Sequence, residues 1–158
     1  ISLNTVDAKL TRKLEPASPM PMKRLEALRR LTESGIHAGV FAAPILPALT
    51  DSYAALDALF AAAKAHGARF VATSLLRLSP DVKAWFFRTL AEQFPERLNA
   101  YRALYRGAYA PEGYAETIRR RVERLRAKYG LPAFAPAPLP RTDEEPAAAE
   151  AVQLTLPF

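Results

Sequence analysis

The sequence predicts an α/β fold with a parallel sheet, followed by a purely helical segment. Three apolar runs have the length of single strands, at residues 1–5, 40–46 and 70–76. The stretches between them place apolar residues at helical spacing and end at Gly35 and Gly67, which are typical left-handed helix caps. Because strands and helices alternate with short connections, the crossovers are expected to be right-handed and the strands parallel.

The run of residues 40–46 is apolar and uncharged, which predicts a strand buried on both faces. Prolines end this strand in a rigid turn at Pro47. Thr50 or Asp51 is expected to cap the following helix, because a short side-chain oxygen accepts from the first free backbone N–H groups. Ligands of parallel α/β folds lie at the carboxyl ends of the strands, so the candidate site is placed around residues 43–51.

Proline positions and apolar spacing define the other elements. Three prolines within residues 6–22 predict a loop there, and the first helix is expected over residues 23–34. The second helix is expected over residues 51–66. Beyond residue 78 the pattern is helical only, with helix starts near Ser79, Pro95 and Pro111.

Two of these later helices have a clear apolar side, and the helices are expected to form a cap packed beside the sheet. In the first helix the apolar side consists of Val82, Trp85, Phe86 and Leu90. In the last helix it consists of Tyr114, Ile118, Val122, Leu125 and Tyr129. The other faces of the last helix are basic, and the candidates there for contacts with nucleic acid are Arg119, Arg120 and Arg124.

The chain has 158 residues, half of them hydrophobic, which is enough for one domain with a core. A complete eight-unit barrel takes about 250 residues. Because Ile1 already lies within a predicted strand, we expect a piece of a longer protein. There is no cysteine, hence no thiolate nucleophile and no cysteine ligand for a metal or cluster. No apolar run reaches the roughly 18 residues of a membrane span, which predicts a cytoplasmic protein without membrane contact.

The net charge of +6 is distributed unevenly. Residues 131–158 carry −3, because Arg141 stands against four acidic residues, and residues 1–130 therefore carry +9. A basic body is compatible with a polyanionic partner such as DNA, although a solvated basic face is the commoner explanation of such a charge. Six prolines among alanines and acids predict that residues 131–158 form a flexible tail.

The end of this tail is apolar again. Gln153, Leu156 and Phe158 occupy the three defined positions of a Gln-x-x-Leu-x-Phe pattern. This pattern is similar to the peptide by which bacterial replication and repair proteins dock on the sliding clamp. A polar anchor followed by two apolar side chains suits an apolar pocket, so the resemblance implies the clamp as a partner.

Polar side chains stand at two of the strand ends. Ser2 and Asn4 project to the same face of the first strand, where they bond either a hydroxyl-bearing ligand or neighbouring backbone. Arg77 follows the third strand, where it either clamps a carboxylate or phosphate or forms a surface salt bridge. No phosphate-binding glycine loop, catalytic triad or pair of acids at motif spacing occurs, so no catalytic residue is assigned.

Several blocks of sequence occur in a characteristic order: residues 2–5, 14–16, 23–31 with 35–36, 43–47 with 50–51, and 75–78. Together they resemble the later half of a radical S-adenosylmethionine (radical SAM) enzyme, in the branch related to spore photoproduct lyase. In that family a partial TIM barrel holds a [4Fe–4S] cluster on a three-cysteine loop, and the cluster cleaves S-adenosylmethionine to a 5'-deoxyadenosyl radical. The resemblance implies that residues 1–78 form the last βαβαβ part of this barrel, residues 79–130 a helical extension and residues 131–158 the tail.

The resemblance also implies which residues contact the cofactor. Ser2 and Asn4 correspond to the strand end that contacts the ribose or methionine part of S-adenosylmethionine. The segment that lies against adenine corresponds to Ala43, Pro44, Ile45 and Leu46. The contact from the following strand corresponds to Leu76 and Arg77.

Two features depart from the family's pattern. The cluster cysteines are absent, so this chain by itself cannot perform the radical chemistry, as expected of a carboxy-terminal fragment. Ala48 stands where the family's turn has a glycine, which puts the backbone shape of this turn in question. The alternative function is that of a non-catalytic basic domain that binds nucleic acid or serves as an adaptor.

Overall fold

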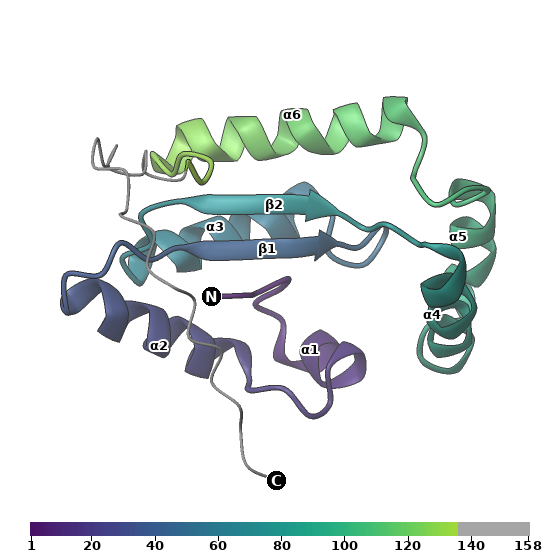
Figure 1. The fold of residues 1–158 in the computed structure, drawn as a ribbon, viewed down its shortest axis with the longest axis horizontal. Coiled ribbons are helices and arrows are strands. Elements are labelled where there is room, and N and C mark those ends of the chain that lie inside the picture. Colours follow the sequence, from purple (N-terminus) through teal and green to yellow (C-terminus); the bar gives the residue numbers. More distant parts are fainter. Residues whose placement is uncertain (136–158) are drawn as a thin grey trace, which may run out of the picture.

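The computed structural model describes residues 1–135 and shows a helix-rich α/β fold around a parallel sheet (Figure 1). Strands β1 (Val40–Ile45) and β2 (Val71–Leu75) pair in parallel, with Val40 opposite Val71. Helix α3 connects the two strands, as the alternating pattern predicts. The expectation of a parallel α/β arrangement is therefore confirmed for these elements.

The amino-terminal segment lies beside the free edge of β1. The Leu3 amide donates to the Phe41 carbonyl at 3.0 Å, and the Phe41 amide donates to the Ile1 carbonyl at 2.8 Å. Ser2 and Phe41 thereby form a parallel bridge, so β1 lies between the first residues and β2. The first strand expected over residues 1–5 is reduced to this short pairing.

The helices of residues 1–135, which include a 3-10 helix, surround the sheet on one side and at its carboxyl end. They are α1 (Ala8–Leu14), α2 (Pro21–Glu33), α3 (Tyr53–Ala65), α4 (Pro80–Gln93), η1 (Pro95–Arg97), α5 (Leu98–Leu104) and α6 (Glu112–Tyr129). The presence of α1 corrects the prediction of a continuous loop over residues 6–22. Asp7 caps this helix, because its Oδ1 accepts from the Lys9 and Leu10 amides at 2.8 and 3.1 Å. The prolines all follow α1 and do not interrupt it.

The ends of the elements agree in part with the predicted caps. Gly35 and Gly67 have the expected left-handed conformation, with φ values of 82° and 80°. The predicted cap of α3 at Thr50 or Asp51 is wrong, because Ser52 accepts from the Ala55 amide at 3.1 Å instead. In the turn before it, Ala48 has a φ of 56°, the left-handed region that glycine adopts most easily.

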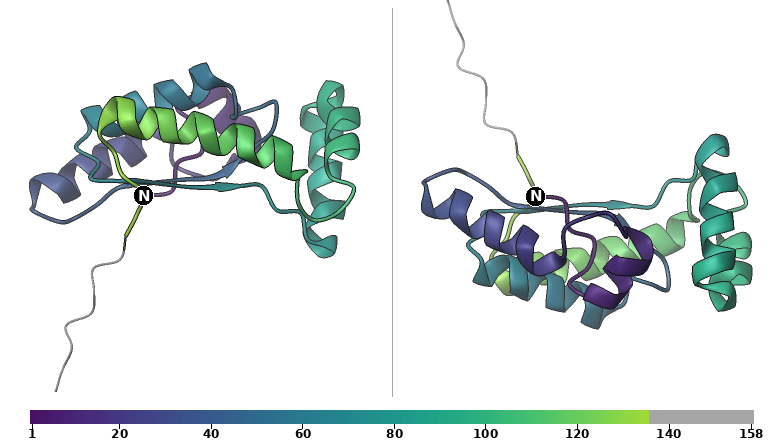
Figure 2. Two further views of the ribbon diagram at one scale, coloured as in Figure 1. Left: turned by 90° about the horizontal axis from the view of Figure 1, so that it is seen from above. Right: turned by 90° about the horizontal axis from the view of Figure 1, so that it is seen from below.

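One face of the sheet is covered by α2, α3 and α6, and no helix of the described residues lies on the other face (Figure 2). Between the sheet and these helices lies a core in which Leu28, Phe60, Val71 and Leu125 are fully buried. Phe41 of β1 points to the other face and is 49% exposed. The prediction that this strand is buried on both faces is therefore wrong, because helices of the described residues pack on only one of them.

A second hydrophobic cluster lies at the carboxyl ends of the strands. Its members come from the segments after β1 and β2 and from the helices α4 and α5, including Leu46, Leu78, Leu90, Tyr101 and Tyr105. Helix α6 belongs instead to the first core, so the helical segment after residue 78 packs in two places. Within residues 1–135, no helix combines the length and the apolar character needed to cross a membrane.

Candidate functional site

A pocket of about 510 Å³ opens where the carboxyl ends of β1 and β2 meet α1 and α4. Six of the eight residues expected to contact a cofactor line this pocket: Asn4, Ala43, Pro44, Leu46, Leu76 and Arg77. Ser2 and Ile45 do not. Ser2 lies in the edge pairing with β1, and the side chain of Ile45 is buried in the first core. The structure therefore brings together most of the predicted site.

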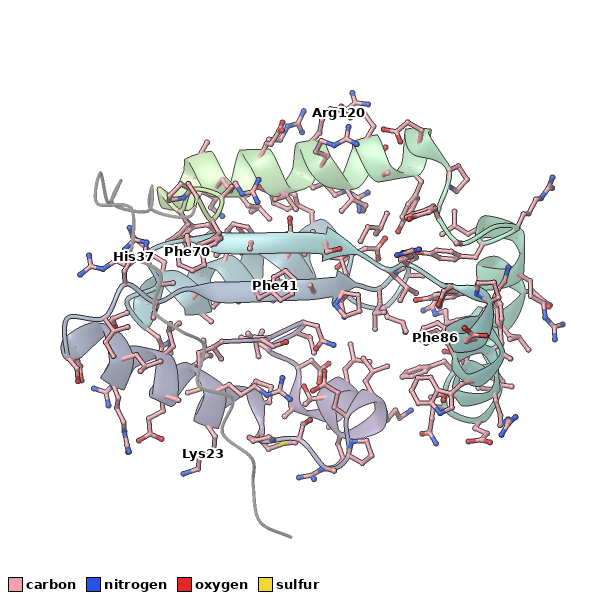
Figure 3. The ribbon with its side chains drawn as sticks, viewed as in Figure 1. Lys23, His37, Phe41, Phe70, Phe86 and Arg120 are labelled. Atoms are coloured by element: carbon pink, nitrogen blue, oxygen red, sulfur yellow. The ribbon has the colours of Figure 1, made fainter. Side chains whose placement is uncertain are left out.

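The floor of the pocket is apolar and rigid. Leu46 and Leu76 are buried, and the Leu76 amide donates to the Ile45 carbonyl at 3.1 Å. From α5's end, the Tyr105 hydroxyl donates to the Leu76 carbonyl at 2.9 Å. Figure 3 shows Phe41 on the uncovered face of the sheet, which continues this apolar surface away from the strand ends.

One corner of the pocket is a polar network around Asn4, which is only 8% exposed. Its Nδ2 donates to Glu15 Oε1 at 3.1 Å, and Arg24 pairs with the other oxygen of Glu15. Arg24 also donates through Nη1 to the Ser2 carbonyl at 3.0 Å. The bond to Glu15 is the one hydrogen bond of the Asn4 side chain among the described residues. The amide is thus held in place, with its oxygen and second N–H available to a ligand.

Arg77 stands at the mouth of the pocket with an exposed side chain. Its guanidinium lies over the ring of Tyr109, 5.3 Å from the ring centroid. Within the described part of the chain it forms no ion pair, so its fork of donors is available. A cation held over an aromatic face and facing a pocket can bind a carboxylate or phosphate through two parallel hydrogen bonds.

Another wall of the pocket is formed by Val82, Trp85 and Phe86 of α4. Figure 3 shows Phe86 between α4 and the strand ends. These residues were predicted as a packing side and not as part of a site. Their helical spacing is the same for a core residue and for a pocket residue, so no signal in the sequence separates the two.

A partly buried polar cluster ties α6 to the loop after β1. The hydroxyl of Tyr114 donates to the carboxylate of Asp51, and Arg121 donates to the Asp51 carbonyl at 2.8 Å. Burial, together with this hydrogen bond, raises the pKa of Tyr114 far above its usual value. Burial likewise raises the pKa of Tyr101, whose hydroxyl has no hydrogen-bond partner within residues 1–135. The contacts of this cluster hold elements of the fold together.

The predicted nucleic-acid residues lie on the outer side of α6. Arg119 pairs with Glu112 at 3.0 Å and also with Glu116, and Arg120 Nε lies 3.4 Å from Glu116 Oε1. Figure 3 shows Arg120 pointing away from the body of the molecule. Arg124 is exposed and has no ion-pair partner in the described range. Two of the three arginines thus already have carboxylate partners.

The remaining predicted residues fall elsewhere. Gln153, Leu156 and Phe158 of the clamp-like peptide lie outside the described residues. In the part of the chain that the structure describes, no three His, Asp or Glu side chains come close enough to hold a metal ion. His37 stacks on Phe70, and His66 Nδ1 lies 2.8 Å from the Ala62 carbonyl.

Comparisons with known proteins find relatives without an assigned function. An uncharacterised protein of Mycobacterium tuberculosis is 40% identical over 158 residues, and so is one of Mycobacterium bovis. Each match covers 99% of this chain and 45% of the relative, so the chain spans less than half the length of these relatives. An uncharacterised protein of Methanocaldococcus jannaschii is 39% identical over 51 residues, which are 32% of this chain and 20% of that protein. No protein-family model and no solved structure matches the chain.

Proposed function

We propose that this chain is the carboxy-terminal part of a radical SAM enzyme and that the pocket at the strand ends binds S-adenosylmethionine. The observation that carries the proposal is the convergence of six implied cofactor residues on one pocket. They come from three segments that are far apart in the sequence, residues 1–5, 43–46 and 76–77. Convergence of this kind at the carboxyl ends of parallel strands is typical of ligand sites.

The chemistry of the pocket fits the parts of this cofactor. The apolar floor at Ala43, Leu46 and Leu76 suits a flat adenine ring. The fixed amide of Asn4 suits the ribose hydroxyls, and the guanidinium of Arg77 suits the methionine carboxylate. In these roles the chain binds the cofactor, orients it and shields it from water.

The iron–sulfur cluster cannot be held by this chain through thiolates, because the chain has no cysteine. The relatives in mycobacteria are more than twice as long, which leaves room for a cluster-binding part in a longer protein of this kind. When bound, cluster and cofactor would supply the 5'-deoxyadenosyl radical. The residues of this chain would position the cofactor on one side of the barrel mouth.

Binding of S-adenosylmethionine to the longer polypeptide, with its cluster reconstituted anaerobically, tests the proposal. We expect Arg77→Gln to weaken the Kd by about 10- to 100-fold, because a hydrogen bond to a charged group is lost. Arg69→Gln is the matched control, since Arg69 is exposed but lies at the amino end of β2. Absence of binding to the wild-type protein, or equal Kd values for both variants, would contradict the proposal.

The alternative, a basic nucleic-acid-binding or adaptor domain, draws its support from the charge of residues 1–130 and from exposed Arg124. In that case DNA binding would fall steeply as salt rises, because phosphate contacts release counterions. It would also fall on substitution of Arg124, while S-adenosylmethionine would not bind. The pairing of Arg119 and Arg120 with glutamates makes this the weaker candidate.

A further inference from the structure

The pocket has a wall that the proposed cofactor contacts do not use. Val82, Trp85 and Phe86 line it from α4, which lies beyond the carboxyl end of the strand that carries Ala43 and Pro44 (Figure 1). Trp85 is 60% exposed and Val82 is 44% exposed, whereas Phe86 is buried in the second cluster. Residues three and four apart on a helix share one face, so these side chains form a continuous apolar surface along the pocket.

Helix α4 does not depend on Trp85 for its position. Phe86 and Leu90 anchor it in the second cluster. The ammonium group of Lys83 donates to the carbonyls of Tyr105, Arg106 and Gly107 at 2.6, 3.2 and 3.3 Å. The indole is therefore presented on a rigid support without being used for packing. A large, flat and exposed ring on such a support is suited to stacking against another ring.

The segment that carries this wall has a positive net charge. Residues 77–109, which include α4 and α5, contain six basic and three acidic residues. Of the two charged residues that line the pocket, Arg77 is assigned to the cofactor carboxylate in the proposed function and Glu15 pairs with Arg24. A ligand that carries both a flat ring and an acidic group would satisfy the apolar wall and the positive surroundings together.

We infer that α4 forms the substrate side of the pocket and that Trp85 stacks on a planar heterocycle of an anionic substrate. The inference rests on the proposed function, in which the opposite wall holds the cofactor. A nucleotide supplies this chemistry either as a free molecule or as an unpaired base in a strand. Trp85 would select the substrate by its ring, independently of the cofactor contacts.

Four probes separate the ring, the charge and the source of the ligand. They are 2'-deoxycytidine 5'-monophosphate, 2'-deoxycytidine, 2-deoxyribose 5-phosphate and a single strand of eight deoxycytidines. Binding is measured on the longer polypeptide with its cluster in place and S-adenosylmethionine at saturation. We expect the monophosphate or the strand to bind, the nucleoside to bind more weakly and the ring-less sugar phosphate not to bind. The tighter of the first two identifies the source.

The variants test the role of the indole itself. Stacking of a base on an aromatic side chain predicts that Trp85→Leu weakens binding of the preferred probe by about 5- to 100-fold. Trp85→Phe should recover most of it. Tyr53→Leu, which removes a comparably exposed aromatic ring from the start of α3, is the control and should have no effect. The Kd for S-adenosylmethionine should be unchanged in all three variants.

Different results would overturn the inference and the proposed function. The inference is wrong if S-adenosylmethionine binds and the Kd values of the ring probes are the same for Trp85→Leu and for the wild-type protein. The inference is also wrong if no ring probe binds to the wild-type protein and Trp85→Leu lowers its unfolding temperature by several degrees. Such a loss of stability would mean that another part of the polypeptide packs on the indole. Failure of S-adenosylmethionine to bind overturns the proposed function, whatever the ring probes do.

Discussion

Helices α6 and α4 each have an apolar side, but the structure uses the two sides differently. On α6, Ile118, Val122 and Leu125 are buried against α3 and β2. On α4, only the half formed by Phe86 and Leu90 is buried, and the other half borders the pocket. Apolar spacing thus predicts a helix in both cases. Whether an apolar residue serves stability or a site depends on what lies opposite, and substitutions on the two helices can separate these roles.

The largest expected difference is in stability, between a buried apolar residue of α6 and an exposed one of α4. Leu125→Ala should lower the free energy of unfolding by about 2–5 kcal/mol, because Leu125 is fully buried and a cavity would remain. Val82→Ala on α4 should change it by no more than about 0.5 kcal/mol, as an exposed position does. Denaturant unfolding of both variants measures the two values. A similar loss of unfolding free energy in the two variants would mean that the exposed half of α4 is buried in solution.

Two tyrosines test the attachment of α6 and α5 to the body of the molecule. Tyr114→Phe on α6 removes the donor to Asp51, whose side chain is buried, and should cost about 1–3 kcal/mol. Tyr101→Phe on α5 removes a buried hydroxyl that has no partner in the described residues, and should be neutral or slightly stabilising. Chemical denaturation compares them. A larger loss for Tyr101→Phe would indicate a partner that its hydroxyl finds outside these contacts.

A smaller effect is expected at the amino end of α4. Lys83→Met keeps most of the apolar stem but removes the ammonium group that binds three carbonyls at the end of α5. The loss should be about 1 kcal/mol, because water can replace part of these hydrogen bonds at a half-exposed position. Thermal unfolding measures this loss, and Lys23→Met on the exposed side of α2 is the control. Equal unfolding temperatures of the two variants would show that the hydrogen bonds of Lys83 do not stabilise the position of α4.

The smallest effect should appear where α6 meets α3 at the surface. Hydrogen bonds from Lys128 and Tyr129 lower the pKa of Asp57 below its usual value. A lowered pKa in the folded state stabilises the protein above the unfolded pKa, and this contribution is lost as pH falls through the folded value. Asp57→Asn should therefore destabilise slightly at neutral pH and have no effect in strong acid. Unfolding midpoints measured across this pH range would reveal any departure from this pattern.

Local signals were sufficient for much of the fold. Gly35 and Gly67 marked helix ends because glycine adopts the left-handed conformation there without strain. Helix α1 was missed because the prolines of residues 6–22 outweighed the capping signal of Asp7. The exposed face of β1 at Phe41 was missed for another reason. Covering a sheet is a tertiary event, and an apolar run has the same pattern whether one or both faces are packed.

The structure brings together part of the site that the resemblance to a family implies. Six of the eight implied residues line one pocket, although they come from distant segments. Ser2 and Ile45 do not line this pocket, because neighbouring residues of a strand point to opposite faces and a shift of one residue changes the face. Trp85 could not be assigned from the sequence, since only the fold shows that the strand ends stand opposite this side of α4.

The backbone at Ala48 has a consequence for how this turn can change in evolution. With a φ of 56°, Ala48 already has the conformation that the expected glycine would supply. An alanine there bears a strain in the folded chain that exceeds what it saves by restricting the unfolded chain, so a glycine would be the more stable residue. A change of Ala48 to glycine would therefore relieve strain while the shape of the turn persists.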